Sequence, residues 1–215
     1  MKKISLCMVV RNEAKQLPQL LKHVRPVIDE MVIFDQSSDD DTGRICTEAG
    51  AKVVTVSRKG LADIDRQDCY SYATCDYILA LDADERPDKA MMKYLHAIRE
   101  GGGRHAIYWF EFRNLVDGVD IKEVLKFDWH PRLWLRTDPA VIDWPTTAHT
   151  FPKFNSQDHL FCTRGKVDHI RTLAKIKRVA AERGPVIDPQ NQQLEVNFGK
   201  AVEELLARKK GTRRG

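Results

Sequence analysis

The sequence predicts an α/β fold with a mostly parallel β-sheet, followed by a helical C-terminal arm. Over the first hundred residues, apolar runs of strand length alternate with amphipathic segments of about ten residues, the pattern of βαβ units. Polar clusters directly follow three of the apolar runs, as expected where parallel strands end at one edge of a sheet. The composition, with 42% hydrophobic and 31% charged residues, is that of a globular chain and excludes a disordered one.

Each expected element in the first half has its own local signal. Strands are predicted over 3–10, 31–35, 51–56 and 76–82. Helices are predicted over 17–24, 41–50, 65–74 and 88–99. The first run is continuously apolar, as in a strand that is buried on both faces. Gly50 ends the second helix, and three glycines from Gly101 onward end the fourth.

The second half has a different pattern. Aromatic-rich strands are predicted over 105–112 and 132–136, and helices over 171–184 and 194–210. We therefore expect an α/β domain over 1–165, with halves at 1–100 and 101–165, and a helical arm with a basic tail over 166–215.

The N-terminus and the cysteines indicate a cytoplasmic protein. The apolar run after "MKK" is too short for a signal peptide and has no cleavage site, and no apolar run reaches 18 residues. The five cysteines form no CxxC pair, which favours free thiols in a reducing compartment. The net charge is +4, and bases gather in the tail "ARKKGTRRG". Either the tail is solvated, or it contacts an anionic membrane or a polyanion from the inner face of the membrane.

Three carboxylates follow the apolar run "YILAL", at Asp82, Asp84 and Glu85. Polar clusters also follow the first two strands, at 11–13 and at Asp35. Asp82 and Asp84 share a face if the strand continues, and two carboxylates raise each other's pKa unless a cation neutralises them. Mg²⁺ or Mn²⁺, a hard ion that prefers oxygen ligands, suits such a site if it also holds a diphosphate.

Several segments resemble motifs of family 2 glycosyltransferases, which have the GT-A fold with a Rossmann-like nucleotide-binding sheet. The segments are "SLCMVVRNEAKQLPQLLKHV", "DEMVIFDQSSDDDTGRI", "RQDCYSYATCDYILALDADE", "WHPRLWLR" and "TTAHT". They occur in the order and at the separations expected of that family. Residues 1–165 would then be the catalytic domain, with the nucleotide sugar bound by the first half and the acceptor by the second.

The resemblance implies an inverting, metal-dependent transfer from a nucleotide sugar, most often a UDP-sugar, to a hydroxyl acceptor such as an envelope glycan. The donor-binding residues would be Val9, Arg11, Asn12, Glu13, Asp35, Ser38, Arg66, Asp82 and Ala83. Asp84 would hold the metal with Asp82 and His149. Two interpretations stay open for Arg66, a cation for the diphosphate or a surface arginine, and two for His149, a ligand or a structural histidine.

Four residues depart from the family pattern. Gln67 stands in place of Asn, Cys75 in place of Gly, and Gln36 and Ser37 in place of an Asp or Thr and a Gly. A non-glycine residue at Cys75 suggests an awkward turn there. None of the four changes the Asp82–Asp84 pair.

An inverting transfer needs a carboxylate to take the proton of the acceptor hydroxyl. We expect Asp128, which lies just before the predicted strand at 132–136, with Glu111 and Asp143 as the next candidates. A solvated loop aspartate is the simpler interpretation of each.

Other functions share parts of this pattern. A nucleotidyltransferase of related fold would use the same crevice and metal, but the segment "RNEAKQL" lacks the glycine-rich loop that handles a triphosphate. A glycosyltransferase that modifies a DNA base or a phage or structural protein, and a non-catalytic nucleotide-sugar-binding protein, are the further alternatives.

Overall fold

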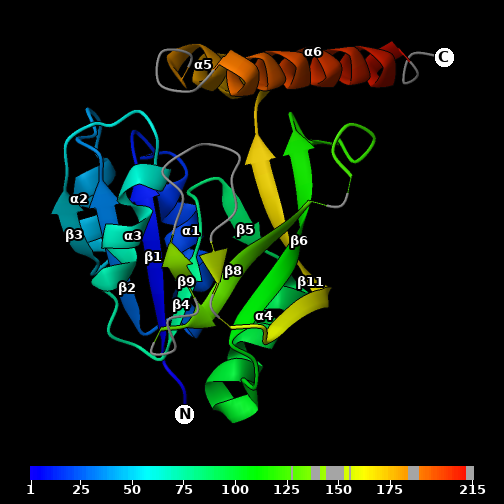
Figure 1. The fold of residues 1–215 in the computed structure, drawn as a ribbon. Helices are drawn as coiled ribbons and strands as arrows, with labels where there is room; N and C mark the ends of the chain where they lie inside the picture. The colour runs from blue at the N-terminus through cyan, green and yellow to red at the C-terminus, as the bar shows by residue number, and fades with distance from the viewer. Residues whose placement is uncertain (127, 137–140, 144–152, 155, 184–188, 212–215) are drawn as a thin grey trace.

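The computed structural model describes residues 1–126, 128–136, 141–143, 153–154, 156–183 and 189–211. The first half contributes β1 (Ile4–Val10), β2 (Glu30–Asp35), β3 (Lys52–Thr55) and β4 (Tyr77–Ala80). The remaining strands of the main sheet are β5 (Glu85–Pro87), β6 (Ile107–Val116), β7 (Val119–Asp120), β8 (Trp129–Leu135) and β11 (His159–Arg171). Within the described residues these nine strands form one sheet, ordered β3-β2-β1-β4-β8-β6-β11-β5, with β7 paired to β6 (Figure 1).

The first four strands pair in parallel, which confirms the predicted α/β fold. All seven residues of β1 are buried, because β2 and β4 flank it and helices cover both of its faces. The helices of this half are α1 (Leu17–Val24), α2 (Thr42–Glu48), α3 (Asp63–Ser71) and α4 (Lys89–Ala97). Asp88 caps α4 by accepting a hydrogen bond from the Met91 amide at 2.7 Å.

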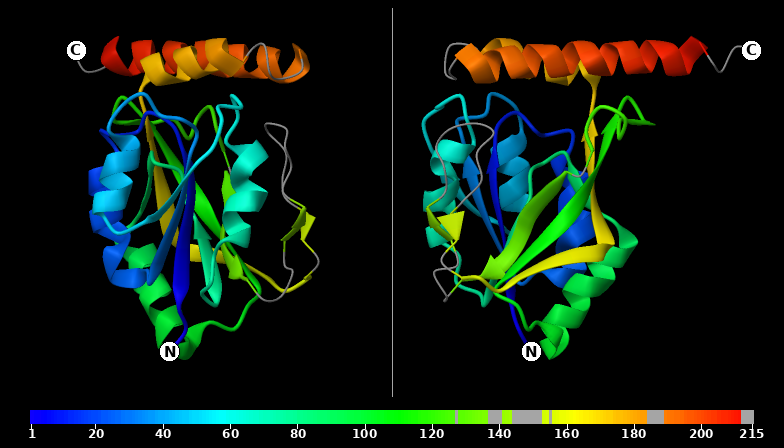
Figure 2. Two further views of the ribbon diagram at one scale, coloured as in Figure 1. Left: turned by 90° about the vertical axis from the view of Figure 1, so that its left-hand side faces the viewer. Right: turned by 45° about the vertical axis from the view of Figure 1, so that its right-hand side comes forward.

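Side chains alternate across the sheet and divide the core into two layers. Leu6 and Met8 of β1 pack in the layer that contains α1, α2 and α4. Cys7 and Val9 pack in the opposite layer, against α3. Figure 2 shows the sheet between α3 on one side and α1, α2 and α4 on the other. Because successive side chains of β1 point to opposite faces of the sheet, the apolar strand packs against helices on both faces.

The second half of the sheet is mixed in direction. β8 is antiparallel to β4 and β6, β11 is parallel to β6, and β5 is antiparallel to β11. β8 begins at Trp129, earlier than the predicted strand at 132–136. The sequence analysis did not predict β5 or β11, and β11 crosses residue 165 before it ends at Arg171. β9 (Val141–Asp143) and β10 (Lys153–Phe154) form a separate two-stranded sheet.

The C-terminal arm consists of α5 (Leu173–Arg183) and α6 (Pro189–Gly211), as predicted. Both helices lie across the end of the sheet toward which β6 and β11 run (Figures 1 and 2). An apolar cluster joins them to the β6–β7 turn; its buried members are Val116, Ile121, Ile176, Val202, Leu205 and Leu206. The arm therefore shares a small core with the sheet.

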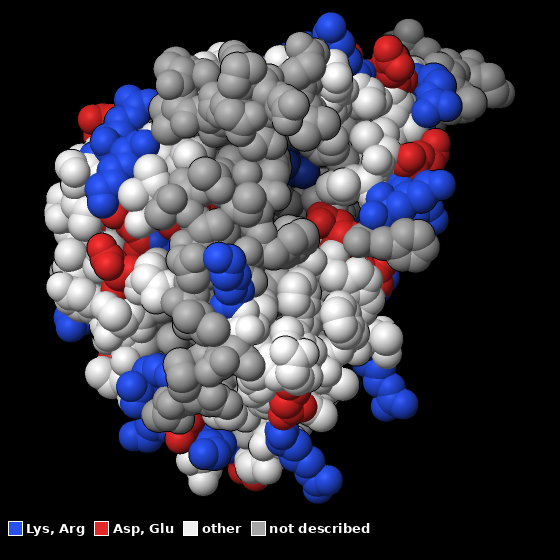
Figure 3. Space-filling view, viewed as in Figure 1, with Lys and Arg blue, Asp and Glu red and all other residues white. Residues whose placement is uncertain are grey.

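The basic tail is partly engaged at the end of α6. Lys209 donates to the carbonyl of Asp120 at 3.1 Å, and Lys209 and Arg208 both pair with Glu123. Figure 3 shows Lys and Arg side chains interspersed with acidic ones on one face of the molecule. No helix in the described ranges combines the length and apolarity that crossing a bilayer requires. All five cysteines are buried free thiols, as the sequence predicted.

Candidate active site

Hydrogen bonds tie the segment after β1 to the segment after β2. The carboxylate of Asp35 accepts hydrogen bonds from the amide of Ser38 at 3.1 Å and from its hydroxyl at 2.5 Å. The Ser38 hydroxyl in turn accepts the amide of Asn12 at 2.9 Å. The guanidinium of Arg11 donates to the carbonyl of Ser37 at 2.6 Å. The predicted donor-binding residues of the two strands are thus held in one connected group.

The backbone of this group adopts the left-handed conformation at two non-glycine positions, Asn12 (φ 52°) and Ser37 (φ 49°). Ser37 occupies a position where glycine is usual in the family that the sequence resembles, and it keeps the glycine-like conformation. Gln36 is buried, and its amide donates to the carbonyl of Leu61 at 2.9 Å. The expectation of an awkward turn at Cys75 is wrong, because Cys75 is not among the described non-glycine residues with positive φ.

Asp82, after β4, is held by arginines. Arg66 donates to Asp82 at 2.7 Å and to Asp63 at 3.0 Å, and Arg132 approaches Asp82 at 3.9 Å. Burial acts to raise the pKa of Asp82, but the two arginines outweigh it and lower that pKa. Arg66 is buried, so its interpretation as a surface arginine is wrong.

Glu85 explains why three carboxylates follow one strand. It is fully buried and accepts two hydrogen bonds from Arg132, at 2.6 and 2.9 Å. It also accepts the amide of Asp82 at 3.2 Å. Burial raises the pKa of Glu85 although Arg132 opposes the shift. Glu85 therefore fixes the loop. Ala83, between the two aspartates, is also buried, and its carbonyl accepts a hydrogen bond from the Arg86 guanidinium at 2.7 Å.

Asp84 lies where three segments meet. One of its carboxylate oxygens is 3.6 Å from Nε2 of His169, and the other is 3.2 Å from Nζ of Lys175. The same Nζ is 2.7 Å from the carboxylate of Glu13, which follows β1. Burial acts to raise the pKa of Asp84, but His169 and Lys175 outweigh it and hold that pKa well below its usual range. The pKa of Glu13 is raised, because burial outweighs the effect of Lys175.

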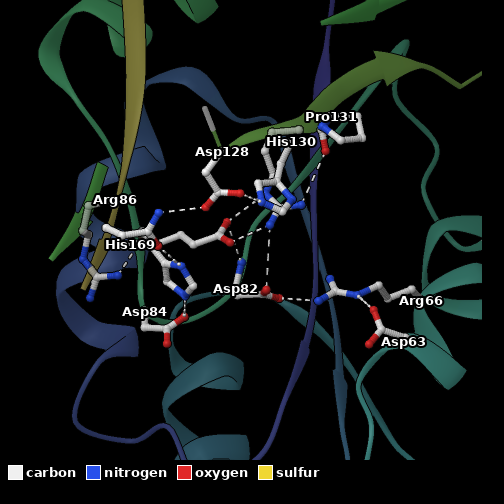
Figure 4. Close-up of polar contacts among 12 residues, drawn as sticks. Asp63, Arg66, Asp82, Asp84, Arg86, Asp128, His130, Pro131 and His169 are labelled. Carbon is white, nitrogen blue, oxygen red and sulfur yellow. Dashed lines mark hydrogen bonds and ion pairs between the residues drawn. The ribbon is translucent and has the colours of Figure 1, made fainter. Parts of the chain in front are cut away.

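Strand pairing brings His169 to Asp84. His169 lies opposite Glu85 in the antiparallel β5–β11 ladder, and the amide of Ile170 donates to the Asp84 carbonyl at 2.7 Å. The ladder fixes the two backbones, so the side chains converge (Figure 4).

Behind His169 runs a chain of polar contacts that ends at Asp128. Nδ1 of His169 lies 3.1 Å from the Asn114 amide oxygen, and the Asn114 amide nitrogen donates to Asp128 at 2.7 Å. The other oxygen of Asp128 is 2.7 Å from Nε2 of His130 (Figure 4). Because Asn114 presents its oxygen to Nδ1, that nitrogen carries the proton and Nε2 is aimed at Asp84.

Asp128 is the base candidate that lies in this network. Burial acts to raise its pKa, but the contacts with His130 and Asn114 lower it, so the carboxylate is ionised near neutral pH. Glu111 pairs with Lys166 at 2.7 Å and alternates along β6 with Phe112 and Asn114, which places it on the other face of the sheet. Asp143 ends β9, and nothing is described of its side chain. His149 lies outside the described residues.

Four functional candidates were not predicted from the sequence patterns, namely Asn114, Arg132, His169 and Lys175. For Arg132 a signal existed, since it lies in "WHPRLWLR", which also resembles the family. For His169 the signal was weak, because apolar and polar residues do not alternate regularly along the sequence of its strand, HLFCTRGKVDHIR. Within the described ranges, no three His, Cys, Asp or Glu residues group in a way that would hold a metal. Asp84 and His169 offer two converging donor atoms.

Comparison with known proteins gives a consistent picture. The model of the family described as "Glycosyl transferase family 2" matches residues 5–152. An uncharacterized glycosyltransferase from Rickettsia felis is 32% identical over 100 residues, which cover 46% of this chain and 34% of that protein. A TPR repeat-containing protein from Synechococcus elongatus is 44% identical over 85 residues, 40% of this chain and 21% of that protein. The match thus spans about a fifth to a third of the length of these curated relatives.

Among solved structures, S. aureus TarS 1–349 in complex with UDP-GlcNAc has a TM-score of 0.59 at 14% identity. The alignment covers 91% of this chain and 71% of that chain. The complex of the same TarS fragment with UDP has a TM-score of 0.58. At this identity the likeness shows the fold alone, which is the GT-A fold.

Proposed function

The chain belongs to glycosyl transferase family 2, and we propose that it transfers a sugar from a nucleotide sugar to a hydroxyl group of an acceptor. The observation that carries the proposal is the position of Asp84, at the end of β4. Its carboxylate faces His169 of β11 and shares Lys175 with Glu13, which follows β1. Ligands of open α/β sheets bind at this edge, where the parallel strands end.

The residues at Asp84 fit a divalent cation. A carboxylate oxygen and an imidazole nitrogen converge there, and Asn114 holds the other nitrogen of the imidazole, as second-shell partners of metal ligands do. Mg²⁺ and Mn²⁺ commonly bind through one or two protein groups, with substrate phosphates and water completing the shell. We propose Asp84 and His169 as the ligands. When bound, the cation would neutralise the charge that develops on the leaving diphosphate.

Asp82 is better suited to the donor than to direct ligation of the metal. Its carboxylate is committed to Arg66 and lies near Arg132. We propose that this carboxylate is oriented toward the ribose side of the donor, while Asp84 serves the metal. The charges of Arg66 and Arg132 are already offset by Asp63, Asp82 and Glu85, so the two arginines add no net positive charge for a nucleoside diphosphate.

For the nucleoside we propose the connected group at the ends of β1 and β2. Asp35 and Ser38 present polar atoms there, and the main chain at Val9 and Arg11 forms the wall beside them. UDP is the nucleotide that we favour, because the family resemblance implies it and because S. aureus TarS 1–349, which has the same fold, has a structure in complex with UDP-GlcNAc.

The proton of the acceptor hydroxyl would pass to the carboxylate of Asp128. Its two oxygens are fixed by Asn114 and His130, and the carboxylate is ionised, as a proton acceptor must be. We propose that the acceptor attacks from the side opposite the leaving diphosphate, which would invert the anomeric centre. We propose Asp128 as the base because Glu111, paired with Lys166, faces away from this network.

The acceptor that the family resemblance favours is an envelope glycan. We propose that the protein works in the cytoplasm, and the five buried free thiols support a reducing compartment. Arg208 and Lys209 pair with Glu123 at an exposed surface, where such pairs contribute little, so contact of the basic tail with an anionic membrane or a polyanion stays a prediction.

The experiment is a turnover assay with a panel of nucleotide sugars and Mn²⁺, in which the released nucleoside diphosphate is measured without acceptor and with mixed glycan acceptors. We expect nucleoside diphosphate from one donor class, faster with acceptor present. Release of pyrophosphate from a nucleoside triphosphate and a sugar phosphate would instead indicate a nucleotidyltransferase. Binding of a nucleotide sugar without turnover on any acceptor would indicate a non-catalytic binding protein.

A further inference from the structure

A cation from the C-terminal arm lies between the carboxylates of the site. Nζ of Lys175 is 2.7 Å from Glu13 and 3.2 Å from Asp84, and all three side chains are at most 22% exposed. These carboxylates follow different strands, β1 and β4, so a residue some ninety positions beyond Asp84 joins them. The sequence analysis assigned no role to this lysine or to α5.

The fold holds Lys175 in this place. The Lys175 amide donates a hydrogen bond to the hydroxyl oxygen of Thr172 at 3.0 Å, so Thr172 caps the start of α5, which begins at Leu173. The next residue, Ile176, is buried in the apolar cluster with Val202 and Leu205 of α6. The helix is therefore anchored on one side while Lys175 reaches into the site on the other.

The position of Lys175 conflicts with a bound divalent cation. The ammonium lies within contact distance of an Asp84 oxygen, and Asp84 is the carboxylate that we assign to the metal. Two cations that share one carboxylate repel each other strongly at such separations. While Lys175 holds one Asp84 oxygen, a metal at the other oxygen, which faces His169, is disfavoured; when the metal takes Asp84, the ammonium is displaced. An ammonium that moves away brings three donors to the region where the phosphates of a donor would lie.

We propose that Lys175 occupies Asp84 in the metal-free protein, yields Asp84 to the divalent cation, and then donates to the diphosphate of the nucleotide. The second half of this proposal rests on the proposed function; the first half concerns only the metal and this chain. The C-terminal arm is then part of the donor site, and loading of the metal is coupled to α5.

The test is direct binding of Mn²⁺ alone, measured from the electron paramagnetic resonance signal of free Mn²⁺, in wild type and in the Lys175→Met variant. Because the variant lacks the competing cation, we expect it to bind Mn²⁺ about three- to tenfold more tightly. The Lys175→Arg variant keeps a cation and should stay closer to wild type. Lys177→Met is the matched control, since Lys177 lies on the same helix and pairs only on the surface with Glu203, both about half exposed.

UDP binding at saturating Mn²⁺, measured by calorimetry, tests the second half. The Lys175→Met variant should bind UDP about tenfold more weakly, because a hydrogen bond to a charged group is lost. Equal or weaker Mn²⁺ affinity in Lys175→Met, or no Mn²⁺ binding to either protein, would overturn the competition. If Mn²⁺ binds as expected but wild type binds no nucleotide, the proposed function fails while the competition stands. Circular dichroism of each variant checks that the fold is kept, and Lys175→Gln replaces Lys175→Met if the latter does not fold.

Discussion

Replacing Arg132 with Met should destabilise the protein strongly, because it leaves a carboxylate buried without its partner. The side chains of Arg132 and Glu85 are 7% and 1% exposed, and two hydrogen bonds at 2.6 and 2.9 Å join them. Removing one member of a buried pair typically costs about 3–5 kcal/mol of the unfolding free energy. Since a domain is stabilised by about 5–15 kcal/mol in all, the loss is a large share of the total.

The effect should depend on pH in a definite direction. Burial already raises the pKa of Glu85, and without Arg132 it should rise further. A carboxyl whose folded pKa is raised binds its proton more readily in the folded state, so stability is lost as pH rises above the unfolded pKa. The deficit of Arg132→Met relative to wild type should therefore grow as pH rises from about 4.3, the ordinary value for glutamate, toward neutrality.

The assay is urea unfolding of Arg132→Met, Glu85→Leu and the double variant, followed by tryptophan fluorescence at pH 5 and pH 7. The double variant removes both charges and should recover most of the loss, because replacing a whole buried pair with apolar residues is often neutral. A deficit of Arg132→Met below about 1 kcal/mol, the range of exposed pairs, would refute the reasoning. So would a double variant that is no more stable than the single one.

Two further variants address the reacting groups. Asp128→Asn should leave UDP-sugar affinity unchanged and lower the rate of transfer by about 10²–10⁴-fold, the usual contribution of a general base. Glu111→Gln, on the other face of β6, is its control and should keep the wild-type rate. A large loss of rate in Glu111→Gln with little loss in Asp128→Asn would assign the base to Glu111. His169→Ala should raise the Mn²⁺ concentration needed for half-maximal activity by about 10–100-fold, whereas His96→Ala, at an exposed position of α4, should not; equal titration curves would return His169 to a structural role.

The strand ends of the first half were predictable because continuous apolar runs mark strands that are buried on both faces. Ile4–Val10 and the segment before Asp82 carried that signal, and the parallel sheet follows from it. The sequence also predicted that Asp35, Asp82 and Asp84 lie at one edge of the sheet, since the carboxyl ends of parallel strands lie on the same side. The roles within the edge did not follow, because Glu85 and Asp84 are both buried and differ in their partners: Arg132 holds Glu85, whereas His169 and Lys175 face Asp84.

The contribution of β11 was not predictable from local pattern. This strand pairs with β6 through a register shift between Cys162 and Lys166, and its exposure does not alternate regularly. The histidine expected at the metal was therefore sought at His149, in the segment that resembled the family, while His169 reached Asp84 through pairing with β5. Lys175 was missed for a similar reason, because only the tertiary position of α5 brings it to Glu13.

The central claim is that the edge at Asp84 binds a nucleotide together with a divalent cation, and calorimetry of UDP binding tests it most directly. Wild type, Asp84→Ala and Asp41→Ala, a control at an exposed residue before α2, are titrated with UDP in Mn²⁺ and in EDTA. We expect Mn²⁺-dependent binding to wild type and Asp41→Ala, and loss of that dependence in Asp84→Ala, whose circular dichroism should show that the fold is kept. Mn²⁺-dependent UDP binding of equal affinity in Asp84→Ala and wild type would contradict the assignment.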